Sequence, residues 1–355
     1  MTKIIALYLP QYHPTKENDE WWGAGFTDWR SVNMAKPLFK GHIQPKIPAD
    51  LGYYDLRLEQ TRIQQGELAQ TYGVDAFCYW HYWFGNGKRL LNNPFDEVVK
   101  SGKPDIPFCL GWANHSWYKK TWVKNGKDQL LIEQEYPGVE DYMFHFNTML
   151  SAFRDKRYFR HDNKLVFMVY SPLANPQIKL FIETWRKLAK DNGLNDFFFI
   201  GHDSYCQNKD KILDYGFDAI YNDNMFAILH KESIIKKGVR WFKMKLFKTP
   251  IVFEYKEAIH YMLSSDENSE DVIPTIIPNW DHSPRSGNRQ PIFVNSHPKY
   301  FRRLVAKACK IANSKHNDLI IVKSWNEWGE GNYLEPDLQY GKGMLEALRE
   351  GKNCK

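Results

Sequence analysis

The sequence predicts an α/β fold consisting of a single (β/α)8 TIM barrel, and three observations support this prediction. Strand-like and helix-like hydrophobic patterns alternate along the whole chain, which indicates β/α units and a parallel sheet. Eight such units can be counted, the number that closes a barrel of this type. The first strand leads into residues 9–14 (LPQYHP), not into the glycine-rich phosphate loop that is usual in an open doubly wound sheet.

Each predicted strand is a short apolar run rich in β-branched and aromatic residues. In chain order the strands are expected near residues 3–9 (KIIALYL), 74–82 (VDAFCYWHY), 106–112 (IPFCLGW), 164–170 (KLVFMVY), 197–202 (FFFIGH), 217–221 (FDAIY), 272–279 (VIPTIIPN) and 318–324 (DLIIVKS). The helices that follow them are expected near residues 56–72, 88–101, 139–153, 177–192, 207–214, 254–265, 298–313 and 342–350. No repeat or linker divides the chain, so residues 1–355 are predicted to form one catalytic domain with a long first loop and an insertion at about 224–253.

The composition is that of a soluble globular protein, with 43% hydrophobic and 25% charged residues. No apolar run approaches the length of a membrane span, and the N-terminus enters the first strand without the apolar stretch of a signal peptide. These observations predict a cytoplasmic protein. The five cysteines are widely spaced and form no C-x-x-C pair, which indicates neither a disulfide framework nor a zinc site.

Polar and aromatic residues gather at the expected C-terminal ends of the strands, where barrels of this type build their active sites. The candidates for substrate binding at successive strand ends are Trp21, Trp22, Asp28 and Trp29; Trp80, His81 and Tyr82; Trp112, Asn114, His115 and Trp117; Tyr170; His202 and Asp203; Asn222; and Trp280. Of the 13 tryptophans, only Trp185 and Trp241 fall elsewhere. Any single tryptophan is more often core packing, but the collective placement favours a carbohydrate cleft, because a sugar ring presents a flat C–H face to an aromatic one. Its expected walls are Trp21, Trp80, Trp112 and Trp280.

Two glutamates, Glu327 and Glu330, follow the eighth strand in the run WNEWGEG. They are three residues apart, so both side chains share one face if the turn is helical. Two carboxyls within reach of one bond are what acid/base cleavage of a glycoside requires. Trp325, Asn326 and Trp328 beside them are further candidates for substrate binding. The alternative is a strand end with two solvated glutamates.

Three histidines, His81, His115 and His202, lie near neighbouring strand ends, where they could ligate a metal ion. No H-x-H or H-E-x-x-H spacing supports such a site, so hydrogen bonding to sugar hydroxyls is favoured. No metal or other cofactor is therefore expected.

One strongly basic segment, residues 231–248 (KESIIKKGVRWFKMKLFK), lies between the sixth and seventh strands. Its seven Lys and Arg against one Glu give a surplus of six, equal to the whole chain's formal net charge of +6. Apolar residues interleave with these cations, as in a helix on a membrane surface or a site for an acidic ligand. The alternative is a solvated helix that covers the barrel. Nucleic acid is not an expected partner, because no binding motif accompanies the segment.

Several long motifs resemble those of one family. They are residues 8–14 (YLPQYHP), 18–23 (NDEWWG), 25–29 (GFTDW), 36–39 (KPLF), 44–45 (QP), 50–55 (DLGYYD), 324–331 (SWNEWGEG) and 334–336 (LEP). They resemble the WbsX-like family of bacterial polysaccharide-locus proteins, which is described as similar to glycoside hydrolase family 99, the endo-α-1,2-mannosidases. The resemblance runs from about residue 3 to residue 340. It adds Tyr8, His13 and Glu335 to the candidates for substrate binding.

The resemblance implies a retaining mechanism, because the Glu-Trp-x-Glu motif of family 99 falls on Glu327 and Glu330. The first glutamate would act as base on the sugar's own 2-hydroxyl, giving a 1,2-anhydro sugar, and the second would protonate the leaving oxygen. The loop at 280–285 (WDHSPR) resembles the family's ligand-contacting loop, which makes Asp281 and Arg285 candidates for substrate binding. Family 99 commonly has His between the glutamates, so Gly329 implies the loss of a contact there.

Three functions remain open. The carboxylate pair supports a glycosidase-type enzyme acting on an α-linked bacterial surface glycan. The family name, the missing signal peptide and the basic segment support a glycosyltransferase of O-antigen or capsular polysaccharide biosynthesis, although neither a glycine-rich loop nor an Asp-x-Asp is present to hold a nucleotide diphosphate. A non-catalytic carbohydrate-binding barrel is the third. The expected partners are an oligosaccharide or polysaccharide and, through residues 231–248, the anionic surface of the inner membrane.

Overall fold

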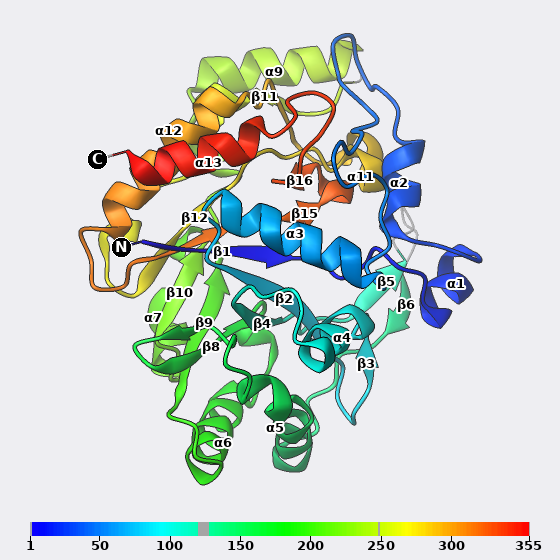
Figure 1. The fold of residues 1–355 in the computed structure, drawn as a ribbon. Coiled ribbons are helices and arrows are strands. Elements are labelled where there is room, and N and C mark those ends of the chain that lie inside the picture. The colour runs from blue at the N-terminus through cyan, green and yellow to red at the C-terminus, as the bar shows by residue number, and fades with distance from the viewer. Residues whose placement is uncertain (1, 120–127, 248, 355) are drawn as a thin grey trace.

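The computed structural model of the protein describes residues 2–119, 128–247 and 249–354. Trp122, one of the tryptophans expected near a strand end, lies outside these residues. Figure 1 shows a central barrel of strands surrounded by helices.

Eight parallel strands form a closed barrel, which confirms the predicted fold class. They are β1 (Lys3–Tyr8), β2 (Ala76–Trp83), β4 (Phe108–Trp112), β8 (Lys164–Val169), β9 (Phe197–Asp203), β10 (Ala219–Asn222), β12 (Val272–Ile276) and β14 (Leu319–Val322). The barrel closes because β1 pairs with both β14 and β2. Ile5 is the partner of Ile321 in one ladder and of Ala76 in the other. The eight positions agree with the apolar runs because a strand covered on both faces must be apolar on both.

Helices cover the outer face of the barrel, and most of them lie where the sequence predicts. They are α3 (Glu59–Thr71), α4 (Asn93–Ser101), α5 (Val139–Phe153), α6 (Ile178–Asp191), α7 (Lys209–Asp214), α10 (Tyr255–Ala258), α12 (Pro298–Ala312) and α13 (Gly343–Asn353). Two are shorter than predicted. The segment at 88–101 starts as β3 (Arg89–Leu90), antiparallel to β2, and becomes helical only at α4. The segment at 254–265 is helical only over α10, because Glu267 accepts hydrogen bonds from the Ser264 N–H (2.7 Å) and hydroxyl (2.8 Å) and so favours a turn.

The remaining elements lie in the loops that connect the barrel strands and helices, mainly at the C-terminal ends of the strands. The helices among them are α1 (Lys16–Trp22), α2 (Asp28–Met34), α8 (Ala227–Lys231), α9 (Ile234–Phe247) and α11 (Ser283–Ser286). The strands are β5 (Trp117–Lys119), β6 (Gln129–Ile132), β7 (Arg160–His161), β11 (Val252–Glu254), β13 (Ile292–Val294), β15 (Asn326–Glu327) and β16 (Asn332–Tyr333). The 3₁₀ turns are η1 (Pro172–Ala174), η2 (Ser204–Cys206), η3 (Asp266–Asn268), η4 (Gly287–Arg289) and η5 (Trp328–Glu330). The single domain with an insertion at about 224–253 stays a prediction.

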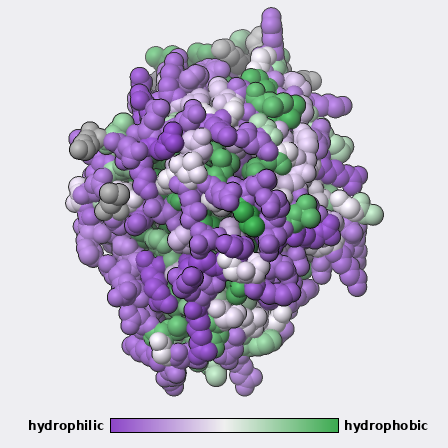
Figure 2. Space-filling view, viewed as in Figure 1, coloured by the Kyte–Doolittle hydropathy of each residue, from purple (hydrophilic) through white to green (hydrophobic). Residues whose placement is uncertain are grey.

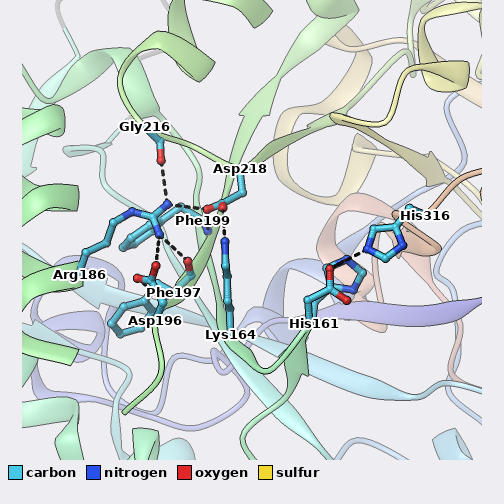
Figure 3. Close-up of polar contacts among 10 residues, drawn as sticks. His161, Lys164, Arg186, Asp196, Phe197, Phe199, Gly216, Asp218 and His316 are labelled. Atoms are coloured by element: carbon cyan, nitrogen blue, oxygen red, sulfur yellow. Dashed lines mark hydrogen bonds and ion pairs between the residues drawn. The ribbon is translucent and has the colours of Figure 1, made fainter. Parts of the chain in front are cut away.

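A polar network joins α6 to the N-terminal ends of three strands (Figure 3). Arg186 of α6 donates hydrogen bonds to Asp196, which precedes β9 (2.8 Å), and to Asp218, which precedes β10 (2.7 Å). Lys164, the first residue of β8, also contacts Asp218 (3.1 Å). These contacts fix this end of the barrel and leave the opposite, C-terminal ends of the strands free to carry polar side chains. Across the described ranges, no helix has the length and apolar character needed to cross a bilayer.

Candidate active site

A cavity of about 500 Å³ opens at the C-terminal ends of the barrel strands, and all eight strand ends contribute to its lining. Its walls include ten of the predicted site residues: Trp80, Tyr82, His115, Trp117, Tyr170, His202, Trp280, Arg285, Glu327 and Glu330. The two glutamates singled out from the sequence therefore share one cavity with two of the four tryptophans expected to wall it.

The alternation of side chains along each strand decides which candidates reach the cavity. On β2, Trp80 and Tyr82 point inward, whereas His81 between them points outward and its Nε2 lies 2.8 Å from Nε2 of His145 on α5. Trp112 of β4 also faces outward, where it packs against α5 and α6. Trp112 is therefore part of the core and not of the cavity wall.

Tyr8 and Asn222 are further candidates that face outward. The Tyr8 hydroxyl donates to Gln65 of α3 (2.7 Å), and the Asn222 amide donates to Glu267 (2.7 Å). Trp21 lies outside the lining as well, because its ring packs edge-on against Trp117.

Other predicted site residues lie outside the cavity lining, and several of them hold its loops in place. This group comprises His13, Trp22, Trp29, Asn114, Asp203, Trp325, Asn326, Trp328 and Glu335. Asn114 exchanges two hydrogen bonds with the backbone of Ser171 and so joins the ends of β4 and β8. Glu335 is buried and accepts hydrogen bonds from the Trp328 indole (2.6 Å) and the Tyr54 hydroxyl (2.8 Å). It is placed to support Trp328, not to contact a ligand.

Only part of the turn that carries the glutamates is helical, because the backbone of Glu327 is non-helical and caps the 3₁₀ turn that follows it. Glu327 ends β15 and Glu330 ends the 3₁₀ turn η5. Tyr12 fixes the backbone on both sides of Glu327, because its hydroxyl donates to the Asn326 carbonyl (2.7 Å) and accepts from the Trp328 N–H (3.0 Å). The glutamate is thus positioned by the loop after β1, at the other end of the chain.

Asp281, predicted to contact a ligand, instead supports Glu330 through its backbone. Its N–H donates to the Glu330 carbonyl (2.8 Å), while its carboxylate contacts His42 (2.7 Å) and Gln44 (2.6 Å) of the first loop. Asp281 is not among the residues that line the cavity.

Arg285 joins three carboxylates at the cavity wall. Its Nη1 donates to Glu330 (2.9 Å), its Nη2 to Glu327 (3.1 Å), and its Nε and Nη2 to Asp28 of α2 (3.1 and 2.7 Å). A Cβ built on Gly329 would overlap both Asp28 and Arg285. The space beside Gly329 is therefore filled by this ion pair.

One guanidinium cannot neutralise three carboxylates, and the electrostatics of Glu327 reflect this. Only 8% of the residue is exposed, and burial, followed by the negative charge of Glu330, raises the pKa of Glu327 to about 8. Arg285 opposes this shift, but its charge is shared with Asp28 and Glu330. Burial and the neighbouring carboxylate therefore favour the protonated form of Glu327.

Two charged cavity residues, Asp223 and Lys323, were not among the predicted site residues. They follow β10 and β14, and their side chains form an ion pair with Lys323 Nζ 2.6 Å from Asp223 Oδ2. Strand alternation could have found them, because both lie at the inward-facing phase of their strands, next to the outward-facing Asn222 and Val322.

The comparisons with known proteins agree with this fold. The family model described as Glycosyltransferase WbsX matches residues 4–348. The chain belongs to this family. Among curated proteins, the uncharacterized protein WxcX of Xanthomonas campestris pv. campestris strain B100 is 34% identical over 358 residues, covering 98% of this chain and 49% of WxcX. The protein of strain ATCC 33913 gives the same values. The chain thus spans about half the length of these relatives.

Solved structures share the barrel at low sequence identity. A glycoside hydrolase-like protein superposes with a TM-score of 0.61 at 15% identity, covering all of this chain and 94% of that one. The GH99 endo-alpha-mannosidase from Bacteroides thetaiotaomicron, in complex with BIS-TRIS-Propane, gives a TM-score of 0.53 at 14% identity, covering 95% of this chain and 87% of that one. These likenesses confirm the (β/α)8 fold of the WbsX chain.

Replacing Glu327 by Gln should change how stability depends on pH. A carboxyl whose pKa is higher in the folded than in the unfolded protein stabilises the fold below its ordinary pKa, and this contribution is lost as pH rises through the folded pKa. From about pH 4.5 to about pH 8, the free energy of unfolding of the wild type should therefore fall relative to that of Glu327→Gln, by on the order of a few kcal/mol. Urea denaturation across this range measures the difference.

The matched control is Glu346→Gln, at an exposed position of α13. Its stability should follow that of the wild type across the same range. A Glu327→Gln curve that stays parallel to the wild type from pH 4.5 to 8 would contradict the buried, protonated state of Glu327.

Proposed function

We propose that this WbsX protein is a retaining glycosidase-type enzyme that cleaves or transglycosylates an α-linked bacterial glycan. The donor would be an oligosaccharide or a lipid-linked glycan. The observation that carries the proposal is the placement of Glu327 and Glu330 in one cavity, both in contact with Arg285. Trp80 and Trp280 in the same lining offer flat faces for sugar rings.

The proposed chemistry uses the sugar's own 2-hydroxyl. Glu327, ionised, removes the hydroxyl proton while the oxygen attacks C1, and Glu330 gives its proton to the oxygen that leaves. The product is a 1,2-anhydro sugar with inverted configuration at C1. Water or an acceptor hydroxyl then opens it at C1 with a second inversion, as Glu330 takes a proton and Glu327 returns one to O2. Water gives hydrolysis and a sugar hydroxyl gives transfer.

Which glutamate holds the proton decides which of the two can act as the acid and which as the base. Burial and the charge of Glu330 raise the pKa of Glu327 and favour its protonated form in the free protein, whereas the proposed mechanism needs the proton on Glu330. Arg285 donates to both carboxylates, so a closer contact with Glu327 once substrate is bound would favour the required arrangement. This observation also favours a second candidate assignment, in which Glu327 is the acid and Glu330 the base.

The family name makes a glycosyltransferase the alternative enzyme class. A nucleotide-sugar donor brings a diphosphate that needs positive charge. Among the described residues that line the cavity, both cations, Arg285 and Lys323, are already paired with carboxylates. The absence of an unpaired cation among these lining residues supports the glycosidase-type enzyme over the glycosyltransferase.

The basic segment supports a second proposal, peripheral association with an anionic membrane. Ile235, Val239, Phe242 and Leu246 of α9 recur at helical spacing, so they share one face, and they are exposed by 80, 52, 60 and 60%. Arg240 points the other way, over the ring of Phe253. In Figure 2, hydrophobic side chains gather along the upper edge of the molecule, where Figure 1 places α9. An exposed apolar stripe among lysines is typical of helices that lie in a membrane interface.

The function is tested by incubating the protein with the surface glycan of its source bacterium and, separately, with a panel of nucleotide sugars. Shortened or rearranged glycan in the absence of nucleotide sugar, abolished by Glu327→Gln, is the expected result. Size analysis of the glycan and assay of released nucleotide provide the readouts. Glycan extension with nucleotide release would overturn the glycosidase-type reading in favour of the transferase.

The roles of the two glutamates are tested by the leaving group. With Glu330 as the acid, Glu330→Gln should slow substrates with poor leaving groups at least about a hundred-fold more than activated aryl glycosides, because a good leaving group needs no protonation. Glu327→Gln should slow both equally. The opposite pattern assigns the acid to Glu327, and equal losses in both variants would falsify an acid/base division between them.

Membrane association is tested by sedimentation with vesicles. The wild type should bind vesicles containing phosphatidylglycerol and not vesicles of phosphatidylcholine alone, because each basic residue near an anionic surface contributes about 1 kcal/mol. Val239→Ser/Phe242→Ser should reduce binding at least about ten-fold, since it removes exposed apolar surface. Leu58→Ser/Leu338→Ser, at exposed apolar positions elsewhere, is the matched control. Equal loss in both double variants, or binding independent of lipid charge, would count against the proposal.

A further inference from the structure

The cavity contains a second charged pair that the proposed mechanism does not use. Lys323 and Asp223 both line it, with only 17% and 6% of their side chains exposed. The Lys323 ammonium has three N–H groups and the contact with Asp223 uses one of them. The Asp223 carboxylate also accepts from the Met225 N–H (3.0 Å), which fixes its orientation. The pair thus presents fixed donors and acceptors side by side.

The charge of this pair indicates the kind of ligand it suits. Asp223 neutralises Lys323, so the pair offers a donor next to an acceptor but no net positive charge. His202 adds none, because burial lowers its pKa to about 4 and leaves the ring neutral. A phosphate or a uronate would therefore find no net positive charge at the pair to balance its own. Two adjacent hydroxyls, one donating to Asp223 and one accepting from Lys323, match the pair.

The surroundings of the pair also suit a sugar ring. Lys323 Nζ lies 5.7 Å from the centre of the Trp280 ring. Tyr170 and His202 stack on each other at 5.0 Å, and both line the same cavity. Flat apolar groups beside a fixed polar pair match a hexose, whose C–H faces are apolar and whose edge carries hydroxyls.

We propose that Lys323 and Asp223 form a sugar-binding subsite that holds two neighbouring hydroxyl groups of an uncharged hexose. In the enzyme, this contact orients the sugar for Glu327 and Glu330, a consequence that rests on the proposed function. The subsite makes the enzyme selective for the configuration of the two hydroxyls and for the absence of charge on the ring.

The test is the binding of defined small probes to the whole protein, followed by saturation-transfer NMR and tryptophan fluorescence. The probes are the methyl α-glycosides of mannose, glucose and galactose, their monodeoxy analogues, the matching methyl uronosides and inorganic phosphate. The variants are Lys323→Met and Lys323→Met/Asp223→Asn. The double variant is included because it leaves no unpaired buried charge and so guards against misfolding. Lys342→Met, which breaks a surface pair with Asp50, is the matched control.

At least one neutral hexoside should bind the wild type, and its affinity should fall about ten- to a hundred-fold in both cavity variants, as expected for hydrogen bonds to charged groups. Lys342→Met should bind as the wild type does. A monodeoxy analogue that lacks one of the two hydroxyls should bind the wild type more weakly by a similar factor. The analogue that lacks the hydroxyl bound by Lys323 should bind the double variant as well as the full hexoside does, because methionine cannot donate a hydrogen bond to that hydroxyl.

Unchanged hexoside binding in folded cavity variants, preferred binding of uronosides or phosphate, or no hexoside binding at all would overturn the subsite. The outcome is separable from that of the proposed function. Glycan cleavage that depends on Glu327 but not on Lys323 would contradict the proposed subsite and leave the proposed function standing. Hexoside binding that depends on Lys323, without any glycan cleavage, would contradict the proposed function and leave the subsite standing.

Discussion

The architecture of the candidate site depends on the ion pairs that Arg285 forms with three carboxylates. It brings together Asp28 from the loop after the first strand with Glu327 and Glu330 from the loop after the last, so the two ends of the chain meet at one guanidinium. The shared charge leaves an excess of negative charge among the carboxylates. One proton on the glutamate pair relieves that excess, and a pair that holds one proton is the starting state that both acid/base assignments require.

The fold could be predicted from the sequence because a barrel strand is buried on both faces and must be apolar along its whole length. All eight runs are strands of the barrel, and residues 319–322 have no exposed surface. The helices at 88–101 and 254–265 were predicted too long. In both segments local contacts outcompete helical periodicity, through pairing with β2 in the first and the Glu267 carboxylate in the second.

The direction of the site's side chains was harder to predict, because proximity to a strand end does not fix which way a side chain points. His81 and Trp112 lie at strand ends yet face the outer helices, whereas Asp223 and Lys323 face the cavity. Side chains alternate between the inner and outer faces along each strand, and this alternation separates the cavity residues from the outward-facing ones. Which residues point inward becomes certain only once the register between strands is known. Glu335 and Asp281 were predicted to bind substrate, and strand alternation could not reveal that they hold neighbouring residues instead, because loops place them.

The close packing at Gly329 constrains substitutions at three positions that are far apart in the sequence. A side chain there would occupy the space taken by Asp28 and Arg285, which come from separate loops on the same rim of the barrel. A histidine can therefore appear at 329 only if that ion pair moves or is replaced, and the charge balance of the glutamate pair would change with it. Positions 28, 285 and 329 therefore depend on one another, and an engineer who grafts this rim of the barrel onto a related scaffold would have to transfer all three together.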